Sequence, residues 1–234
     1  MEKSIEQLKK KLTNPLRGLI PKNLTDVEER FMEIAKNLFE NYCLKSDTKA
    51  FRFAEIEFYY YKKGGRCNLD EEWVEKWNKV TYPRDKNAGE LFFHYSGVDI
   101  CFQSIFKDNN VEFGGILIRS VLEEDEETTK LHAGPQYCAN LILNSCVNHL
   151  PQLAELEVTK RKECELKTAV RFGIDKAERE REEKDDFRLC FYLDNLNWEK
   201  ASERTVWNTK QGEYKERTRN YEKERFSNIH KKDN

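Results

Sequence analysis

One segment constrains the fold more than any other, because its composition is that of a strand. Residues 51–61 read FRFAEIEFYYY. Aromatic residues fit the pleated surface of a sheet, and alternate side chains of a strand point to opposite faces. One face of this strand is apolar and carries Ala54, Ile56, Phe58 and Tyr60. The other face carries Phe53, Glu55, Glu57, Tyr59 and Tyr61. We therefore predict a strand that packs on one side and displays two acids and two phenols beside them on the other.

The remaining elements point to an α+β fold. Thr25-Asp26-Val27-Glu28 fits a capping box, and apolar residues follow it at helical spacing. Gly64-Gly65 marks a turn, and Gly134-Pro135 introduces an apolar helix. Alternating or apolar patterns predict further strands within four segments: 90–106, 111–123, 170–174 and 187–195. Because strands outnumber strand–helix–strand patterns, we expect a mostly antiparallel sheet with flanking helices.

The chain is long enough for one domain of generous size, with 234 residues. We divide it into a polar N-terminal segment (1–24), a single α+β domain (25–200) and a charged C-terminal helix or tail (201–234). The last part has nine Lys and Arg against six Asp and Glu, with aromatics between them. Such a mixture can grip a phosphate backbone, although a solvated amphipathic helix explains it equally well.

The net charge limits which partners the protein can bind, and the spacing of its cysteines and histidines argues against a metal site. The formal net charge is −2, so any DNA-binding surface would be a local patch rather than a basic molecule. Seven cysteines are scattered without a CxxC pair, and four histidines are isolated, so we expect no metal and no other cofactor. No apolar run resembles a signal peptide or a membrane span. We expect a monomer in the cytoplasm, away from membranes.

Two acids and one arginine are the candidates for chemistry. Glu55 and Glu57 point the same way from one strand, roughly 6.5–7 Å apart. Arg119 lies in the apolar segment GGILIRSV, where an arginine needs a partner. A salt bridge between Arg119 and either acid is the plainer interpretation, and the pattern alone favours it. A cation that lines a pocket beside two carboxylates is the functional interpretation, and the two are compatible.

Seven short motifs, spread from about residue 50 to residue 200, add a second line of argument. They are EIEFY (55–59), GELFF (89–93), Ser96-Gly97 followed by CFQ (101–103), ILIRS (116–120), GPQYC (134–138), RFGI (171–174) and RLCFYL (188–193) with Trp198. Each motif alone is weak. Together, in this order, they resemble the alkyladenine (methylpurine, 3-methyladenine) DNA glycosylases, of which this chain would be a divergent member.

The resemblance implies a monofunctional DNA glycosylase of base excision repair. Such an enzyme flips a damaged nucleotide out of the duplex and hydrolyses the glycosidic bond of an alkylated or otherwise modified purine. Glu57 aligns with the carboxylate that activates water, and Arg119 aligns with the arginine beside that water. Tyr59 aligns with a residue that stacks on the flipped purine. The resemblance implies no metal and no organic cofactor.

Other substrate-binding positions depart from the family's pattern. Tyr82 falls where the family has a second stacking residue, a histidine. Gln103 replaces an asparagine that lies near the flipped base and is one methylene longer. Glu55 completes the substrate-binding set beside Glu57. These changes imply that the pocket accepts a different base or acts on single strands.

The family's wedge residue is the clearest departure. The tyrosine that fills the gap left by the flipped nucleotide aligns with Ser96, whose side chain cannot replace a base in the stack. Phe93, His94 or Tyr95 could take its place if the loop is shifted. Two alternatives therefore stay open: a catalytically inactive module that binds nucleic acid or nucleosides, and an N-glycosidase of small nucleosides.

Overall fold

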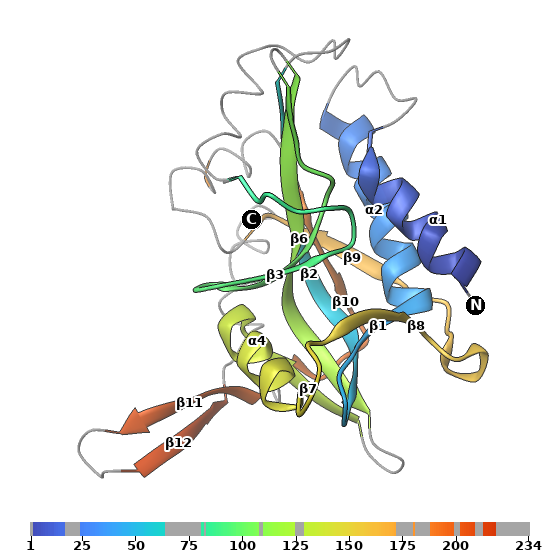
Figure 1. The fold of residues 1–234 in the computed structure, drawn as a ribbon. Coiled ribbons are helices and arrows are strands. Elements are labelled where there is room, and N and C mark those ends of the chain that lie inside the picture. The colour runs from blue at the N-terminus through green and yellow to red at the C-terminus, as the bar shows by residue number, and fades with distance from the viewer. Residues whose placement is uncertain are drawn as a thin grey trace, which may run out of the picture.

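The computed structural model describes residues 2–16, 24–63, 81, 83–107, 110–124, 129–171, 180, 188–198, 202–208 and 213–218. Within these residues one curled, mostly antiparallel sheet is covered by helices, so the predicted α+β class is confirmed. Figure 1 shows α1 and α2 on one side of the sheet and α4 on the other. Among the described helices, none is long and apolar enough to cross a membrane.

The helices are α1 (Glu2–Thr13), α2 (Leu24–Asn41) and α4 (Pro135–Asn144), with one 3-10 turn, η1 (Val158–Lys160). The strands are β1 (Tyr42–Lys45), β2 (Ala50–Lys63), β3 (Leu91–His94), β4 (Gly97–Cys101), β5 (Ile105–Lys107), β6 (Asn110–Glu124), β7 (Thr129–Ala133), β8 (Gln152–Glu155), β9 (Leu166–Ala169), β10 (Cys190–Leu193), β11 (Ser202–Asn208) and β12 (Glu213–Thr218).

The long antiparallel ladder between β2 and β6 is the centre of the sheet. The edge of β2 that faces away from β6 pairs first with β1 and then with β10. The other edge of β6 pairs in turn with β5, β4 and β7. β6 therefore has a neighbouring strand on both sides along most of its length, whereas β2 has one on both sides only in its first half, at residues 50–52 and 55–57.

The two faces of β2 differ in polarity as the alternation predicted, but the polar face is not displayed to solvent: Glu55 and Glu57 are 0% exposed and Tyr59 is 6% exposed. Ile56, Phe58 and Tyr60 belong to the buried core under α2, where the Phe58 ring stacks on Phe31 with centroids 4.6 Å apart. Phe102 joins them from the loop after β4, 6.0 Å from Phe31. This aromatic layer holds the sheet against the helices and leaves the other face to polar side chains.

Both ends of the chain differ from the expectation. The polar N-terminal segment (1–24), for which no helix was predicted, contains α1, because Leu8 and Leu12 are one helical turn apart and are fully buried against the core. In place of a C-terminal helix, β11 and β12 form a hairpin, and β11 continues the sheet in parallel to β7. Residues 219–234 lie outside the described part of the chain.

Three of the four predicted extended segments contain strands, with breaks that the pattern did not show. Residues 90–106 contain three strands, because a turn at 95–96 folds β3 onto β4. β5 and β6 pair antiparallel through Lys107 and Asn110, as a hairpin requires. Strand β10 lies within the predicted segment 187–195, but the strand predicted at 170–174 is not seen: β9 ends at Ala169 and pairs with β10, and residues 170–171 are not in a strand. Residues 172–174 and the Gly64-Gly65 turn lie outside the described residues.

Candidate functional site

A β-bulge in the central ladder creates the site. The pairing is regular up to Phe53 and from Ile56 onward, with register shifts around Glu55. Ser120 is opposite Glu55 and Ile118 is opposite Ile56, so Arg119 is the extra residue on β6. A bulge lets two consecutive residues turn toward the same face. Arg119 and Ser120 consequently both reach the carboxylates of β2.

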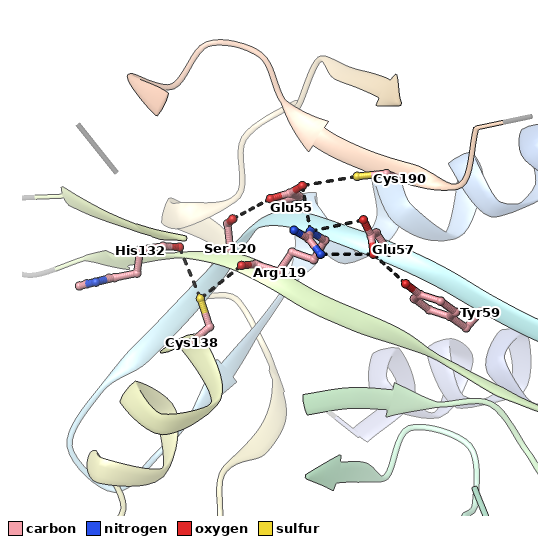
Figure 2. A network of polar contacts seen from close by, with 8 residues as sticks. All are labelled: Glu55, Glu57, Tyr59, Arg119, Ser120, His132, Cys138 and Cys190. Atoms are coloured by element: carbon pink, nitrogen blue, oxygen red, sulfur yellow. Dashed lines mark hydrogen bonds and ion pairs between the residues drawn. The ribbon is translucent and has the colours of Figure 1, made fainter. Parts of the chain in front are cut away.

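The two carboxylates share one guanidinium. Arg119 Nε is 3.3 Å from Glu55 Oε1 and 3.3 Å from Glu57 Oε1, and Arg119 Nη1 is 3.5 Å from Glu57 Oε2. Both glutamates are 0% exposed and the arginine is 2% exposed. Figure 2 shows the guanidinium between the two acids. Removing one partner from a buried ion pair costs about 3–5 kcal/mol, so these three side chains depend on each other.

Tyr59 adds a hydrogen bond to Glu57. Its hydroxyl donates to Glu57 Oε2 at 2.9 Å, as Figure 2 shows. Burial, reinforced by the charge of Glu57, raises the pKa of the Tyr59 phenol well above its ordinary value. The phenol therefore stays protonated at neutral pH and serves as a permanent donor to the carboxylate.

Arg171 is a fourth charged residue of the site, and sequence reasoning gave it no role. Its Cζ atom is 4.8 Å from the centroid of the Tyr59 ring, and its Nη1 donates to Phe58 O at 3.2 Å. The motif RFGI marked the segment but gave no sign that the arginine returns to β2. The contact spans 113 residues of sequence, which no local pattern can reveal.

Glu55 has further partners that fix its position. Ser120 Oγ donates to Glu55 Oε2 at 2.8 Å, and the Cys190 thiol donates to Glu55 Oε1 at 3.5 Å. Cys190 comes from β10, directly opposite Glu57 in the ladder. Glu55 is thus bonded to Arg119, to a hydroxyl and to a thiol, which suits an anchor for the arginine.

The carboxylates and the thiol of this cluster are also potential metal ligands. Ligand atoms of Glu55, Glu57 and Cys190 lie within 4.8 Å of one another. Arg119, however, already bonds both carboxylates, and an ion at the same place would have to displace its guanidinium. The arrangement fits an ion-pair cluster better than a metal centre.

A second charged cluster lies on the same face of the sheet. Asp99 on β4 is opposite Leu117, which in turn is opposite Glu57, so the two acids share a face. Arg84 Nε donates to Asp99 Oδ2 at 2.6 Å, and His94 Nε2 is 3.2 Å from the same oxygen. The predicted substrate-binding residue His94 therefore contacts Asp99, which lies on the same face of the sheet as Glu57.

Two other predicted substrate-binding residues are not brought to Glu57. Phe93 pairs with Val98 on the apolar face of the sheet, the face that packs against α1 and α2. Phe93 and Gln103 both line a cavity of about 890 Å³ bounded by α1, residues 86–91 and residues 150–153. Gln103 is held there by hydrogen bonds with Ala88 N and Asn87 Oδ1.

The remaining predicted positions lie around the hairpin of β3 and β4. Tyr82 is outside the described residues, two positions before Arg84. Ser96 is in the turn, where its backbone N–H donates to His94 Nδ1 at 3.3 Å. Its neighbour Tyr95 is 88% exposed, so the turn presents an aromatic ring to solvent.

Helix α4 is joined to the strand that carries Arg119. The Cys138 thiol donates to Arg119 O and to His132 O, each at 3.5 Å, as Figure 2 shows. Burial raises the pKa of this thiol far above its ordinary value, so it remains a neutral donor. The thiol thereby joins helix α4 to the bulged residue on β6 and to the neighbouring strand β7.

No model of a known protein family, no curated protein and no solved structure matches this chain. What its own fold and site define is an α+β protein whose central ladder carries a buried carboxylate pair, bridged by one arginine and bordered by a tyrosine ring.

Proposed function

We propose that the protein hydrolyses the N-glycosidic bond of a modified purine nucleotide in DNA, with Glu57 as the base that activates water. One observation carries the proposal: Glu57, Arg119 and Tyr59 form a single buried cluster on one face of the sheet. The same three residues are those that the resemblance to the alkyladenine DNA glycosylases assigns to water activation and base stacking.

The main catalytic group that the reaction requires is a carboxylate positioned to accept a proton from water. A water oxygen bonds to the sugar C1′ while the bond from C1′ to the purine nitrogen breaks, and its electron pair leaves with the base. The water proton passes to Glu57. Arg119 orients the carboxylate through contacts of 3.3 Å to Glu57 Oε1 and 3.5 Å to Glu57 Oε2. A positioned general base contributes about 10²–10⁴-fold in rate.

A duplex substrate also needs a group that replaces the flipped base. Tyr95 is exposed at the tip of the β3–β4 hairpin, next to Ser96. Its ring is large enough to fill the gap that a flipped nucleotide leaves in the base stack. His94 connects this hairpin to Asp99 on the face that carries Glu57. We therefore assign the wedge role to Tyr95 rather than to Ser96.

The test is base release from labelled oligonucleotides that carry hypoxanthine, ethenoadenine or a methylated purine, as duplexes and as single strands. Glu57→Gln should lower release by at least about 100-fold, because an amide cannot accept the proton. Glu112→Gln is the matched control. Glu112 is also a buried, hydrogen-bonded glutamate, but it bonds Tyr60 and Lys62, away from the cluster.

The outcomes separate the three candidate functions. Release by the wild type and by Glu112→Gln, but not by Glu57→Gln, would support the glycosylase. Release from free nucleosides alone would favour a nucleoside N-glycosidase. Binding without release from any substrate would leave a non-catalytic binding module, and full activity of Glu57→Gln would remove Glu57 from the mechanism.

A further inference from the structure

The cavity beside α1 is bordered by two edge strands of the sheet. Its volume is about 890 Å³, and its lining includes Leu91 and Phe93 of β3 and Leu153 of β8. Within the described part of the chain, β3 pairs only with β4, and β8 pairs only with β1. Ligand cavities commonly have volumes of about 300–1,000 Å³, so the space between these edges is large enough to be a binding site.

The hydrogen-bond pattern shows which way the backbone of β3 points. In an antiparallel pair, residues bonded to the partner strand alternate with residues whose N–H and C=O point away from it. Cys101 N donates to Glu90 O at 2.9 Å, so the alternation directs the backbone of Phe92 toward β4 as well. The backbone groups of Leu91 and Phe93 therefore point away from β4, and no described residue bonds them.

The same reasoning applies to β8. Leu156 N donates to Asn41 O at 2.8 Å, in register with the β1–β8 ladder. Leu156 and Ala154 thus face β1, and the backbone N–H and C=O of Leu153 point away from it. Edges with outward-pointing backbone groups are templates for pairing with a further strand.

The charges of the lining favour an uncharged ligand. Four charged residues line the cavity, and they form two ion pairs: Lys9 with Glu6 at 3.5 Å, and Lys86 with Glu90 at 4.0 Å. The lining therefore has no excess charge to complement a phosphate or a strongly charged peptide. Leu150 also lines the cavity and is 70% exposed, so an apolar ligand would cover it.

We propose that this cavity binds an extended, uncharged peptide segment of a partner protein, which adds as a strand to the edge of β3. Its backbone bonds that of Leu91 and Phe93, and apolar side chains at every second position enter the cavity. Its other edge faces Leu153. The cavity is on the side of the sheet covered by α1 and α2 (Figure 1), so the proposal does not depend on Glu57 or on the proposed hydrolysis.

The test uses a panel of fluorescent hexapeptides with blocked ends, which have Val, Ile, Leu or Phe at alternate positions and Ser or Thr between them. Fluorescence anisotropy with the full chain identifies the tightest binder. This peptide is then made in two N-methylated forms, each of which lacks the amide donors of one edge. We expect one of the two forms to bind about tenfold or more weakly, because two hydrogen bonds to β3 are lost.

Two variants locate the binding edge. Leu91→Pro removes an N–H at an edge position, where proline is tolerated, and Leu91→Val keeps both the N–H and an apolar side chain. Peptide affinity should fall about threefold or more in Leu91→Pro and stay near the wild-type value in Leu91→Val. The unfolding midpoint of each variant verifies that it is folded.

Amide hydrogen exchange, measured by NMR, examines the same edge without any substitution. In the free protein the amides of Leu91 and Phe93 should exchange faster than that of Phe92, which is directed at β4. Saturation with the peptide should slow exchange at Leu91 and Phe93 and leave Phe92 unchanged.

Three results would overturn the proposal: no binding by any peptide of the panel, equal affinities of the unmethylated peptide and both methylated forms, or unchanged exchange at Leu91 and Phe93 in the saturated protein. Peptide binding by Glu57→Gln should equal that of the wild type. Loss of the proposed hydrolysis and absence of this peptide site are therefore distinguishable.

Discussion

Single residues in this protein are tied to distant parts of the chain by charged hydrogen bonds. Arg119 is the clearest case, because its one guanidinium lies between two buried glutamates and contacts both of them. Glu55 has a hydroxyl and a thiol as further donors, whereas Glu57 has the Tyr59 phenol. The two acids therefore have different environments, which is consistent with the proposed roles of Glu55 as an anchor and Glu57 as a base.

Asp47 gives a prediction at the same scale. Its Oδ2 accepts hydrogen bonds from the backbone N–H groups of His149, Asn148 and Val147, at 2.9, 2.7 and 2.8 Å. These bonds hold the pKa of the Asp47 carboxyl well below its ordinary value. A lowered pKa in the folded state means that the stabilisation is complete above the unfolded pKa of about 3.9 and is lost as the pH falls below it.

We therefore expect Asp47→Asn to be less stable than the wild type at pH 7, and the difference to shrink at pH 3. Urea unfolding at the two pH values measures both differences. Asp85→Asn, a change at an exposed aspartate, is the control and should leave the pH dependence as in the wild type. Equal losses for Asp47→Asn at pH 3 and pH 7 would contradict the charge-based explanation.

The sequence could identify some of these residues and not others, for a physical reason. Glu55, Glu57 and Tyr59 follow from the two-residue period of one strand, and Arg119 stands out as a charge in an apolar run. Ser120 and Arg171 could not be found this way. Ser120 faces the site because of the bulge, and Arg171 because the chain returns to β2 after more than a hundred residues.

At the scale of elements, the β2–β6 ladder depends on one glycine. Gly114 has φ +147°, and a Cβ atom there would lie 2.0 Å from Tyr59 O and 2.9 Å from Tyr60 Cα. Both atoms belong to the backbone of β2, which cannot move aside without breaking the ladder. The close approach therefore brings the two strands together at the residue that contacts Glu57.

Gly114→Ala should cost about 3–5 kcal/mol in the free energy of unfolding, since it combines a backbone clash with an unfavourable φ. Gly134→Ala separates the two effects, because Gly134 also has a positive φ (+101°) but its nearest contact would be 3.8 Å away. That change should cost only about 1–3 kcal/mol. Denaturant unfolding gives both values, and a tolerated Gly114→Ala would mean that the strands can separate here.

Helices and strands could be predicted where the sequence pattern is long. The prediction failed where tertiary contacts determine whether a segment forms a helix or a strand. The strand in 51–61 and the helix after Thr25 both exist, because alternation and helical spacing are local properties. The helix α1 was missed because it buries only a narrow stripe around Leu8 and Leu12 among charged residues. The β11–β12 hairpin forms where charge suggested a helix, and it is joined to the sheet through β7.

At the scale of the whole molecule, the fold buries most of the thiols that the structure describes and so protects them from alkylation. Cys43, Cys101, Cys138 and Cys190 are buried, whereas Cys146 and Cys164 are partly exposed. Burial raises the pKa of Cys101 to about 12, and a thiol that does not ionise does not alkylate. Cys67 lies outside the described residues.

Among the six thiols that the structure describes, native-state alkylation with iodoacetamide, read by mass spectrometry, should therefore label Cys146 and Cys164 first. The four buried thiols should label only in denaturant. Cys190 is the informative one because it touches Glu55 and lies opposite Glu57. Labelling of Cys190 at the rate of Cys146 in the native protein would contradict the closed arrangement of the site.

The position of Glu57 on β2 has a consequence for how such a protein would work. At this residue the strand is hydrogen-bonded to β6 on one side and to β10 on the other. Backbone in the middle of a sheet opens only in rare, large fluctuations, so the carboxylate is a fixed point on the timescale of turnover. The substrate of the proposed reaction would have to come to the acid, so its rate of entry would depend on the groups that cover this face of the sheet rather than on β2 itself.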